Sequence, residues 1–221
     1  MKQRLILFSV IIAIFFLWST PALYPLKLLI VFFHESSHAL MTIATGGQVI
    51  ELEIDRMQGG HVISAGGNRF ITLTAGYLGS LIWGVVIYLL AVGSKYDKAI
   101  MFCLGIIIMA VTTLFVRDLF AFGFGGLTGL FMILMGVKAP MQINDIILRV
   151  IGVTSMSYVP LDVYSDTIAR RSLRSDAFML AEEFGGTTVL WGTIWLLVSV
   201  VILIATLKIS LKFSSVTETK S

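Results

Sequence analysis

The segment that decides the fold is residues 28–41, which read LLIVFFHESSHALM. At its centre stands the pentapeptide HESSH, an H-E-x-x-H pattern. Positions i and i+4 of a helix lie on one face, so the imidazoles of His34 and His38 can reach a single metal ion. Glu35 lies beside them and can polarise a water molecule without being a ligand itself. The apolar flanks predict that this metal site lies within a membrane helix.

The composition supports a membrane protein. Hydrophobic residues make up 57% of the chain and charged residues 13%, with a mean hydropathy of +0.94; soluble domains have about 45–50% and about 25%. The net charge of +3 is scattered along the chain, which argues against a nucleic-acid partner. Cys103 is the single cysteine, so neither a disulfide framework nor a cysteine-based zinc site is available. Any metal must be held by imidazole and carboxylate groups.

Apolar runs along the chain predict about six transmembrane helices. They cover residues 5–18, 26–44, 70–92, 99–116, 119–137 and 189–207. Pro21 and Pro25 separate the first two, because proline removes a backbone donor and disfavours helix in the residue before it. A further stretch, 141–164, could be partly embedded. We expect one polytopic membrane domain over residues 1–212 and a polar tail over 213–221. The 16 lysines and arginines divide equally between the two sides, so they do not predict the orientation.

A different pattern appears between residues 46 and 68, where apolar and acidic side chains alternate with a period of two. The alternating residues are Ile50, Glu51, Leu52, Glu53, Ile54 and Asp55. This period predicts a strand with its three apolar side chains on one side. The turn-prone pair Gly59-Gly60 follows, and residues 61–64 can return as a second strand. A short β-hairpin is therefore predicted after the metal-binding helix.

A third metal ligand remains to be found, because a catalytic zinc ion generally takes three protein ligands. His61, in the predicted hairpin, is the only other histidine. Among the carboxylates Asp162 stands out, since it ends an apolar stretch at 146–163 that could bring it to membrane depth. Asp166 and Asp176 are the competing carboxylates.

Four features together resemble the site-2-protease type of intramembrane zinc metallopeptidase. They are the H-E-x-x-H in an apolar helix, the glycine-rich strand-forming loop, the segment AGYLGS at 75–80 and the distal Leu161-Asp162. More narrowly, the chain resembles the small bacterial and plant branch described as peptidase-like, in which a Tyr-x-x-x-Asp segment precedes Ser-Asp-Ala, here residues 175–177. The resemblance covers roughly residues 26 to 200.

The resemblance implies a site of His34, His38 and Asp162 around Zn²⁺, with Glu35 as the general base. The wider family carries its third ligand in a Leu-Asp-Gly motif. This chain has Val163 in place of that glycine, so Asp166, Asp176 and His61 stay open as alternatives. The resemblance also implies a multi-pass protein of a bacterial plasma membrane that acts on membrane-embedded protein substrates.

The leading functional hypothesis is therefore an intramembrane zinc metalloprotease. Its peptide substrate must be extended before attack, and the hairpin could supply a strand edge for that purpose. The candidate substrate-binding residues are Ile50, Leu52, Ile54, Gly60 and His61. Two alternatives involve no hydrolysis: a membrane metal-binding protein or transporter that uses the same histidines, and a pseudo-peptidase that binds membrane partners as a scaffold.

Overall fold

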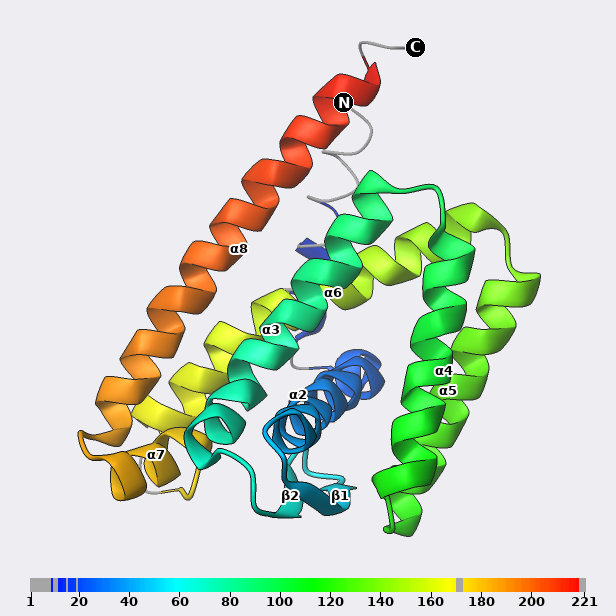
Figure 1. The fold of residues 1–221 in the computed structure, drawn as a ribbon. Helices are drawn as coiled ribbons and strands as arrows, with labels where there is room; N and C mark the ends of the chain where they lie inside the picture. The colour runs from blue at the N-terminus through cyan, green and yellow to red at the C-terminus, as the bar shows by residue number, and fades with distance from the viewer. Residues whose placement is uncertain (1–8, 10–11, 15, 19, 170–172, 219–221) are drawn as a thin grey trace.

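The computed structural model describes residues 9, 12–14, 16–18, 20–169 and 173–218. Within these residues it is an assembly of helices with one β-hairpin (Figure 1). The helices are η1 (Pro21–Leu23), α2 (Tyr24–Ala44), α3 (Arg69–Gly93), α4 (Asp97–Phe115), α5 (Leu119–Lys138), α6 (Met141–Tyr164), η2 (Ser165–Ala169), α7 (Asp176–Phe184) and α8 (Thr188–Glu218). The strands are β1 (Gln48–Ile54) and β2 (Gly60–Ala65).

Six helices in the described part of the chain are long and apolar enough to cross a membrane, which confirms the predicted fold class. They are Pro21–Ala44, Arg69–Gly93, Asp97–Phe115, Leu119–Lys138, Met141–Ala169 and Thr188–Ser210. One member of the predicted set differs. Half of the predicted span at 5–18 lies outside the described residues. The set of six is completed instead by the stretch at 141–169, which we expected to be only partly embedded.

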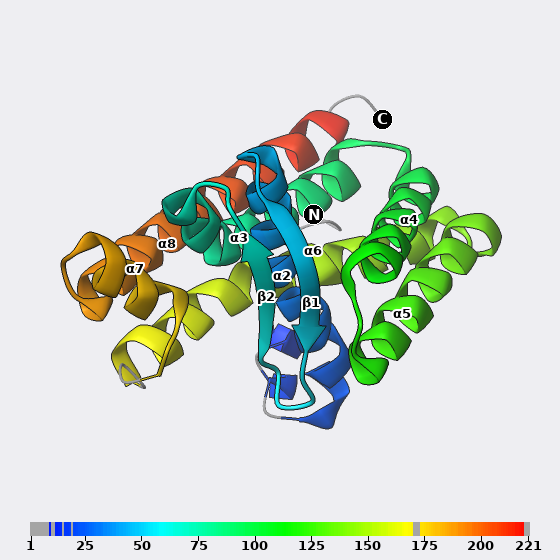
Figure 2. The same ribbon diagram turned by 60° about the horizontal axis from the view of Figure 1, so that its bottom comes forward.

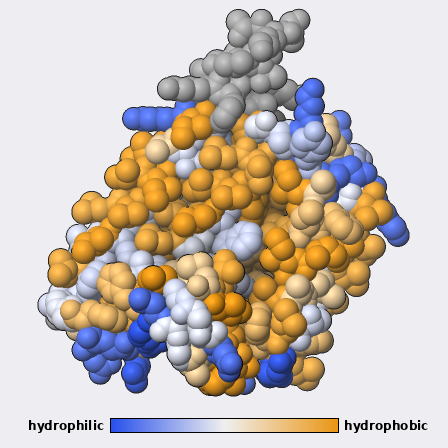
Figure 3. All heavy atoms as spheres, viewed as in Figure 1, coloured by the Kyte–Doolittle hydropathy of each residue, from blue (hydrophilic) through white to orange (hydrophobic). Residues whose placement is uncertain are grey.

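The surface agrees with a membrane-embedded body. Figure 3 shows apolar residues across the middle of the molecule, while hydrophilic residues lie at its upper edges and at its lower end, where the hairpin and α7 lie in Figure 1. Helix α8 continues past its membrane-spanning part to Glu218. The segment 213–221, predicted as a polar tail, is therefore helical up to that residue.

Helix α2 lies at the centre of the assembly (Figure 1). Its span is 67% buried within the protein, whereas that of the peripheral α8 is 17% buried. Helices α3 and α6 pack against α2, and the hairpin lies across it (Figure 2). The approach of α3 is close, because a side chain at Gly79 would collide with Ser37 of the motif. Helix α2 is thus enclosed by protein, which is where ionisable residues at membrane depth are tolerated.

The hairpin is confirmed, but its apolar side chains do not share one side. Strands β1 and β2 pair antiparallel, and the register shifts between Val49 and Glu51. Such a bulge adds one residue to a strand and reverses the faces beyond it. Leu52 and Ile54 are therefore fully buried, whereas Ile50 is 57% exposed. The expectation that Ile50 lies on the same side as the other two was wrong for this reason.

The chain reaches α7 by an irregular route. Helix α6 contains Pro160, and a π-helical turn, η2, follows its end. Helix α7 then begins after Ser175, whose side chain accepts a hydrogen bond from the backbone N–H of Phe178 at 3.3 Å. Serine is a favoured N-cap because it satisfies one of the free N–H groups of the first turn. Ala177 and Leu180 of α7 are fully buried, so this short helix is packed against the bundle.

Candidate metal centre

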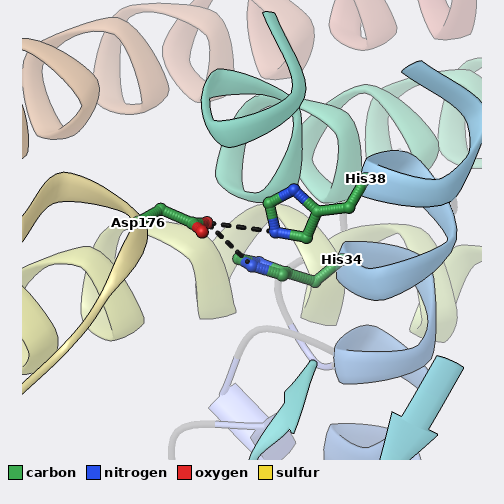
Figure 4. Close-up of side chains that lie close together, drawn as sticks. All are labelled: His34, His38 and Asp176. Atoms are coloured by element: carbon green, nitrogen blue, oxygen red, sulfur yellow. Dashed lines mark ion pairs between the residues drawn. The ribbon is translucent and has the colours of Figure 1, made fainter. Parts of the chain in front are cut away.

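Three side chains from two helices converge on one point (Figure 4). His34 and His38 extend from adjacent turns of α2, and Asp176 is the first residue of α7. Asp176 Oδ2 lies 3.1 Å from His34 Nε2 and 3.2 Å from His38 Nε2. One nitrogen or oxygen atom of each residue lies within 4.8 Å of the others, a spacing that a single metal ion can bridge.

The third member of this group is Asp176 and not Asp162. Asp162 and Asp166 line the same cavity, but neither belongs to the group around the two histidines. His61 also lines the cavity, but it belongs to a separate, partly exposed group with two glutamates, and its Nε2 is 3.5 Å from Glu53 Oε2. The geometry therefore favours Asp176, one of the alternatives left open by the sequence. The reason is that α7 docks its first residue beside α2, whereas Asp162 remains on α6.

A backbone contact sets the orientation of His38. Its Nδ1 lies 2.7 Å from the carbonyl oxygen of Thr72 in the first turn of α3. A carbonyl can only accept a hydrogen bond, so Nδ1 carries a proton and Nε2 is the ring nitrogen left to bind a metal ion. A partner of this kind on the second ring nitrogen is the usual way in which a metal-ligating histidine is held.

The donor set fits a divalent metal ion. Asp176 Oδ2 is buried and has no hydrogen bond of acceptable geometry, although two imidazole nitrogens lie nearby. A metal ion among the three atoms would satisfy this buried oxygen. Burial alone would raise the pKa of the Asp176 carboxyl, but His38 and His34 beside it lower that pKa below its usual range. The carboxylate is therefore in the ionised form that binds metal.

Gly76 of α3 leaves the space that an ion would need. A Cβ atom at this residue would lie no more than 2.6 Å from each of the three converging atoms. That is close to the length of a zinc–ligand bond, about 2.0–2.2 Å. Any larger residue at this site would compete with the ion for the same space.

The general-base candidate lies against the hairpin. Glu35 is 4% exposed. A Cβ atom at Gly60, the first residue of β2, would lie 2.8 Å from the Cγ and Oε1 atoms of Glu35. Because Gly60 has no side chain, the hairpin can approach the carboxylate this closely.

A cavity of about 550 Å³ opens over these residues. Glu35 and both histidines line it on one side, and β2 lines it through Gly60, His61 and other residues. Of the five predicted substrate-binding residues, only Gly60 and His61 are among its lining in the described part of the chain. Leu52 and Ile54 are buried in the core instead, and Ile50 faces outward.

The family model described as Peptidase M50B-like matches residues 7–206. The chain belongs to this family. No curated protein and no solved structure matches the chain. The matched residues include both histidines, Glu35, the hairpin and Asp176, and the match agrees with the resemblance to site-2-protease-type enzymes. Membership in the Peptidase M50B-like family and the six apolar helices together indicate a multi-pass membrane protein of a metallopeptidase family.

Three residues that lie at the candidate metal centre were not predicted from the sequence: Thr72, Gly76 and Tyr77. They lie within the first nine residues of α3, which follows the hairpin. The segment AGYLGS contains two of them, and its small residues indicate close helix packing. Nothing in the sequence shows that this packing is against the metal ligands. For Asp176 a signal exists, since Ser175 followed by an acidic residue and an apolar run is typical of a helix start.

Proposed function

We propose that the protein is a zinc-dependent intramembrane peptidase that cleaves membrane-embedded protein substrates. The observation that carries this proposal is the convergence of Asp176 with His34 and His38 beside Glu35, where α2, the helix of the last three residues, is long and apolar enough to span a membrane. Two imidazoles and one carboxylate are a donor set of catalytic zinc sites, which keep one position free for water or substrate. The cavity provides room for both.

Zinc at this site would supply Lewis acidity that makes a water molecule acidic at about neutral pH. Glu35 would accept the proton of the attacking water and pass it to the leaving amine. Thr72 would keep His38 in the required tautomer through its carbonyl oxygen. Polar residues, including Gln58 and Arg69, line the cavity and support entry of water from the hydrophilic end of the molecule.

The substrate would lie along β2. A helical substrate hides its peptide carbonyls in intrahelical hydrogen bonds, so the cleaved stretch must be extended. In the described sheet, β1 pairs with β2 and also forms a bridge from Leu52 to Val116. The outer edge of β2 is therefore the one open to a further strand, and β2 residues line the cavity. Leu52 and Ile54 would serve by anchoring the hairpin rather than by touching substrate.

The test uses the purified full chain in detergent micelles with a model transmembrane peptide that carries a central glycine pair. We expect fragments from the unmodified protein, and a loss of about 10²–10⁴-fold in Glu35→Gln with zinc content unchanged. Glu182→Gln, a change outside the cavity lining, serves as the matched control and should cleave normally. A zinc-loaded unmodified protein that cleaves no peptide would favour a metal carrier or a pseudo-peptidase scaffold instead. A bacterial plasma membrane is the location that the family resemblance supports.

A further inference from the structure

The two histidines of the metal centre are held in different ways. His38 has a hydrogen bond from Nδ1 to the carbonyl oxygen of Thr72. For His34, no hydrogen bond through Nδ1 is found in the described part of the chain. Its imidazole contacts two rings instead, His38 at a centroid distance of 4.7 Å and Tyr77 at 4.9 Å. The orientation of His34 therefore depends on ring packing.

Tyr77 is the ring that can hold His34 in place. It follows Gly76 on α3, is 2% exposed, and meets the imidazole at an interplanar angle of 85°. Trp195 of α8 packs against Tyr77 at a centroid distance of 5.1 Å. An edge-to-face contact between aromatic rings is directional, so a fixed Tyr77 disfavours rotation of the imidazole away from Asp176.

The phenol of Tyr77 is itself anchored. Its hydroxyl donates a hydrogen bond to Asp166 Oδ2 at 2.9 Å. Asp166 lies in the π-helical turn η2 at the end of α6, and such turns are frequent at functional sites. This turn is packed tightly, since a side chain at Gly192 of α8 would collide with Thr167. The contacts form a chain from η2 through Tyr77 to His34.

We propose that Tyr77 is a positioning residue for His34 and that Asp166 holds Tyr77 in the required orientation. This assigns a role to Asp166, which lines the cavity without joining the ligand group. The inference rests only on the metal-binding part of the proposed function. Outer-shell partners of metal ligands contribute about 10–100-fold to metal affinity, and the same order is expected from Tyr77.

The experiment measures the affinity of the metal-stripped full chain for Co²⁺, together with the absorption spectrum that reports its coordination. Tyr77→Leu should weaken binding by about 10–100-fold and change the spectrum. Tyr88 offers a matched control, because it is also 2% exposed on α3 and donates a hydrogen bond, to Ser210 at 3.3 Å. Tyr88→Leu should leave Co²⁺ affinity unchanged.

A second set of variants tests the anchor without removing the ring. Tyr77→Phe and Asp166→Leu should each weaken Co²⁺ binding less than Tyr77→Leu, and the double variant should be no weaker than either alone. Asp166→Asn keeps an acceptor oxygen and should restore the affinity. Asp162→Asn removes a charge from the same cavity, four residues before Asp166, and as the control it should leave Co²⁺ affinity unchanged.

Three results would overturn the inference. They are unchanged Co²⁺ affinity in Tyr77→Leu, an equal loss in Tyr88→Leu, and additive losses in Tyr77→Phe combined with Asp166→Leu. The third result remains informative even if Tyr77→Leu does not fold, because it does not involve that variant. An unmodified protein that binds Co²⁺ but cleaves no peptide would refute the proposed peptidase function and leave the positioning role of Tyr77 standing.

Discussion

Helices α2 and α7 supply the candidate ligands of one metal centre, but the sequence predicts the two sets unequally well. Helix α2 has 21 residues, lies at the core and provides His34 and His38 from adjacent turns. Helix α7 has 9 residues, lies outside the candidate spans and provides Asp176 from its first turn. The comparison shows that helical spacing alone can place two ligands, whereas the third depends on how a short helix docks.

The docking of α7 uses both apolar and polar contacts. Ala177 and Leu180 are fully buried against the bundle. The ring of Phe184 meets Phe70 of α3 at a centroid distance of 5.4 Å. Arg69 and Glu183 form an ion pair at 3.1 Å. Helix α3 contacts both α2 and α7, so it sets how the two helices that carry the candidate ligands lie relative to each other.

The largest effect is expected from the ligand that α7 supplies. Asp176→Ala should lower zinc affinity by more than about 100-fold, beyond the range for outer-shell residues, and abolish cleavage. Asp162→Ala is the matched control, since it removes a carboxylate from the same cavity without touching the ligand group. Zinc content by mass spectrometry distinguishes them. If Asp162→Ala lost zinc and Asp176→Ala kept it, the original assignment from the sequence would be restored.

The next largest loss of zinc affinity is expected from a change at Gly76, which lies between the two helices that carry the candidate ligands. Gly76→Ala would place a methyl group within 2.6 Å of all three ligand atoms. Overpacking costs about 1–3 kcal/mol, which corresponds to about 5–150-fold in zinc affinity. Gly123→Ala is the control, because a Cβ atom at Gly123 meets nothing within 4 Å. Zinc titration in which Gly76→Ala and the control bind equally well would show that the ion does not use this space.

A smaller effect is expected from a change beside Glu35 of α2 that contacts none of the candidate metal ligands. Gly60→Ala would press a methyl group against Glu35 and against the backbone oxygen of Glu53. The carboxylate must then shift, and we expect cleavage to fall about tenfold. Zinc content should stay unchanged, because no ligand is contacted. Peptide cleavage and zinc content are measured on the same sample; a loss of zinc would place Gly60 in the metal centre rather than beside the base.

The smallest effect belongs to the surface contact that ties α7 to α3. Glu183→Gln removes the ion pair with Arg69, in which both side chains are substantially exposed. Exposed pairs contribute about 0.2–1 kcal/mol, so zinc affinity should fall less than about fivefold. Glu182→Gln breaks the more exposed pair with Arg174 and should have no larger effect. A tenfold loss of affinity in Glu183→Gln would mean that this ion pair, rather than apolar packing, docks α7.

The hairpin contains one feature that the local sequence pattern predicts and one that it does not. Alternation at residues 50–55 predicted strand β1, and Gly59-Gly60 predicted the turn, since both signals involve neighbours in the chain. The bulge that turns Ile50 away from Leu52 has no local signature, because it arises from pairing with β2. Residues that need only their neighbours were thus predicted, and a residue whose direction depends on pairing was not.

The sequence by itself determined the membrane-helical class, the positions of His34, Glu35 and His38 on one helix, and the hairpin that follows. Composition, helical periodicity and strand alternation are local properties, and each is complete within a short segment. The tertiary structure decided that Asp176 rather than Asp162 lies with the two histidines and that Gly76 leaves open space beside these three side chains. These choices depend on contacts between α2, α3 and α7, which lie far apart in the chain, and no spacing rule relates residues across so many intervening helices.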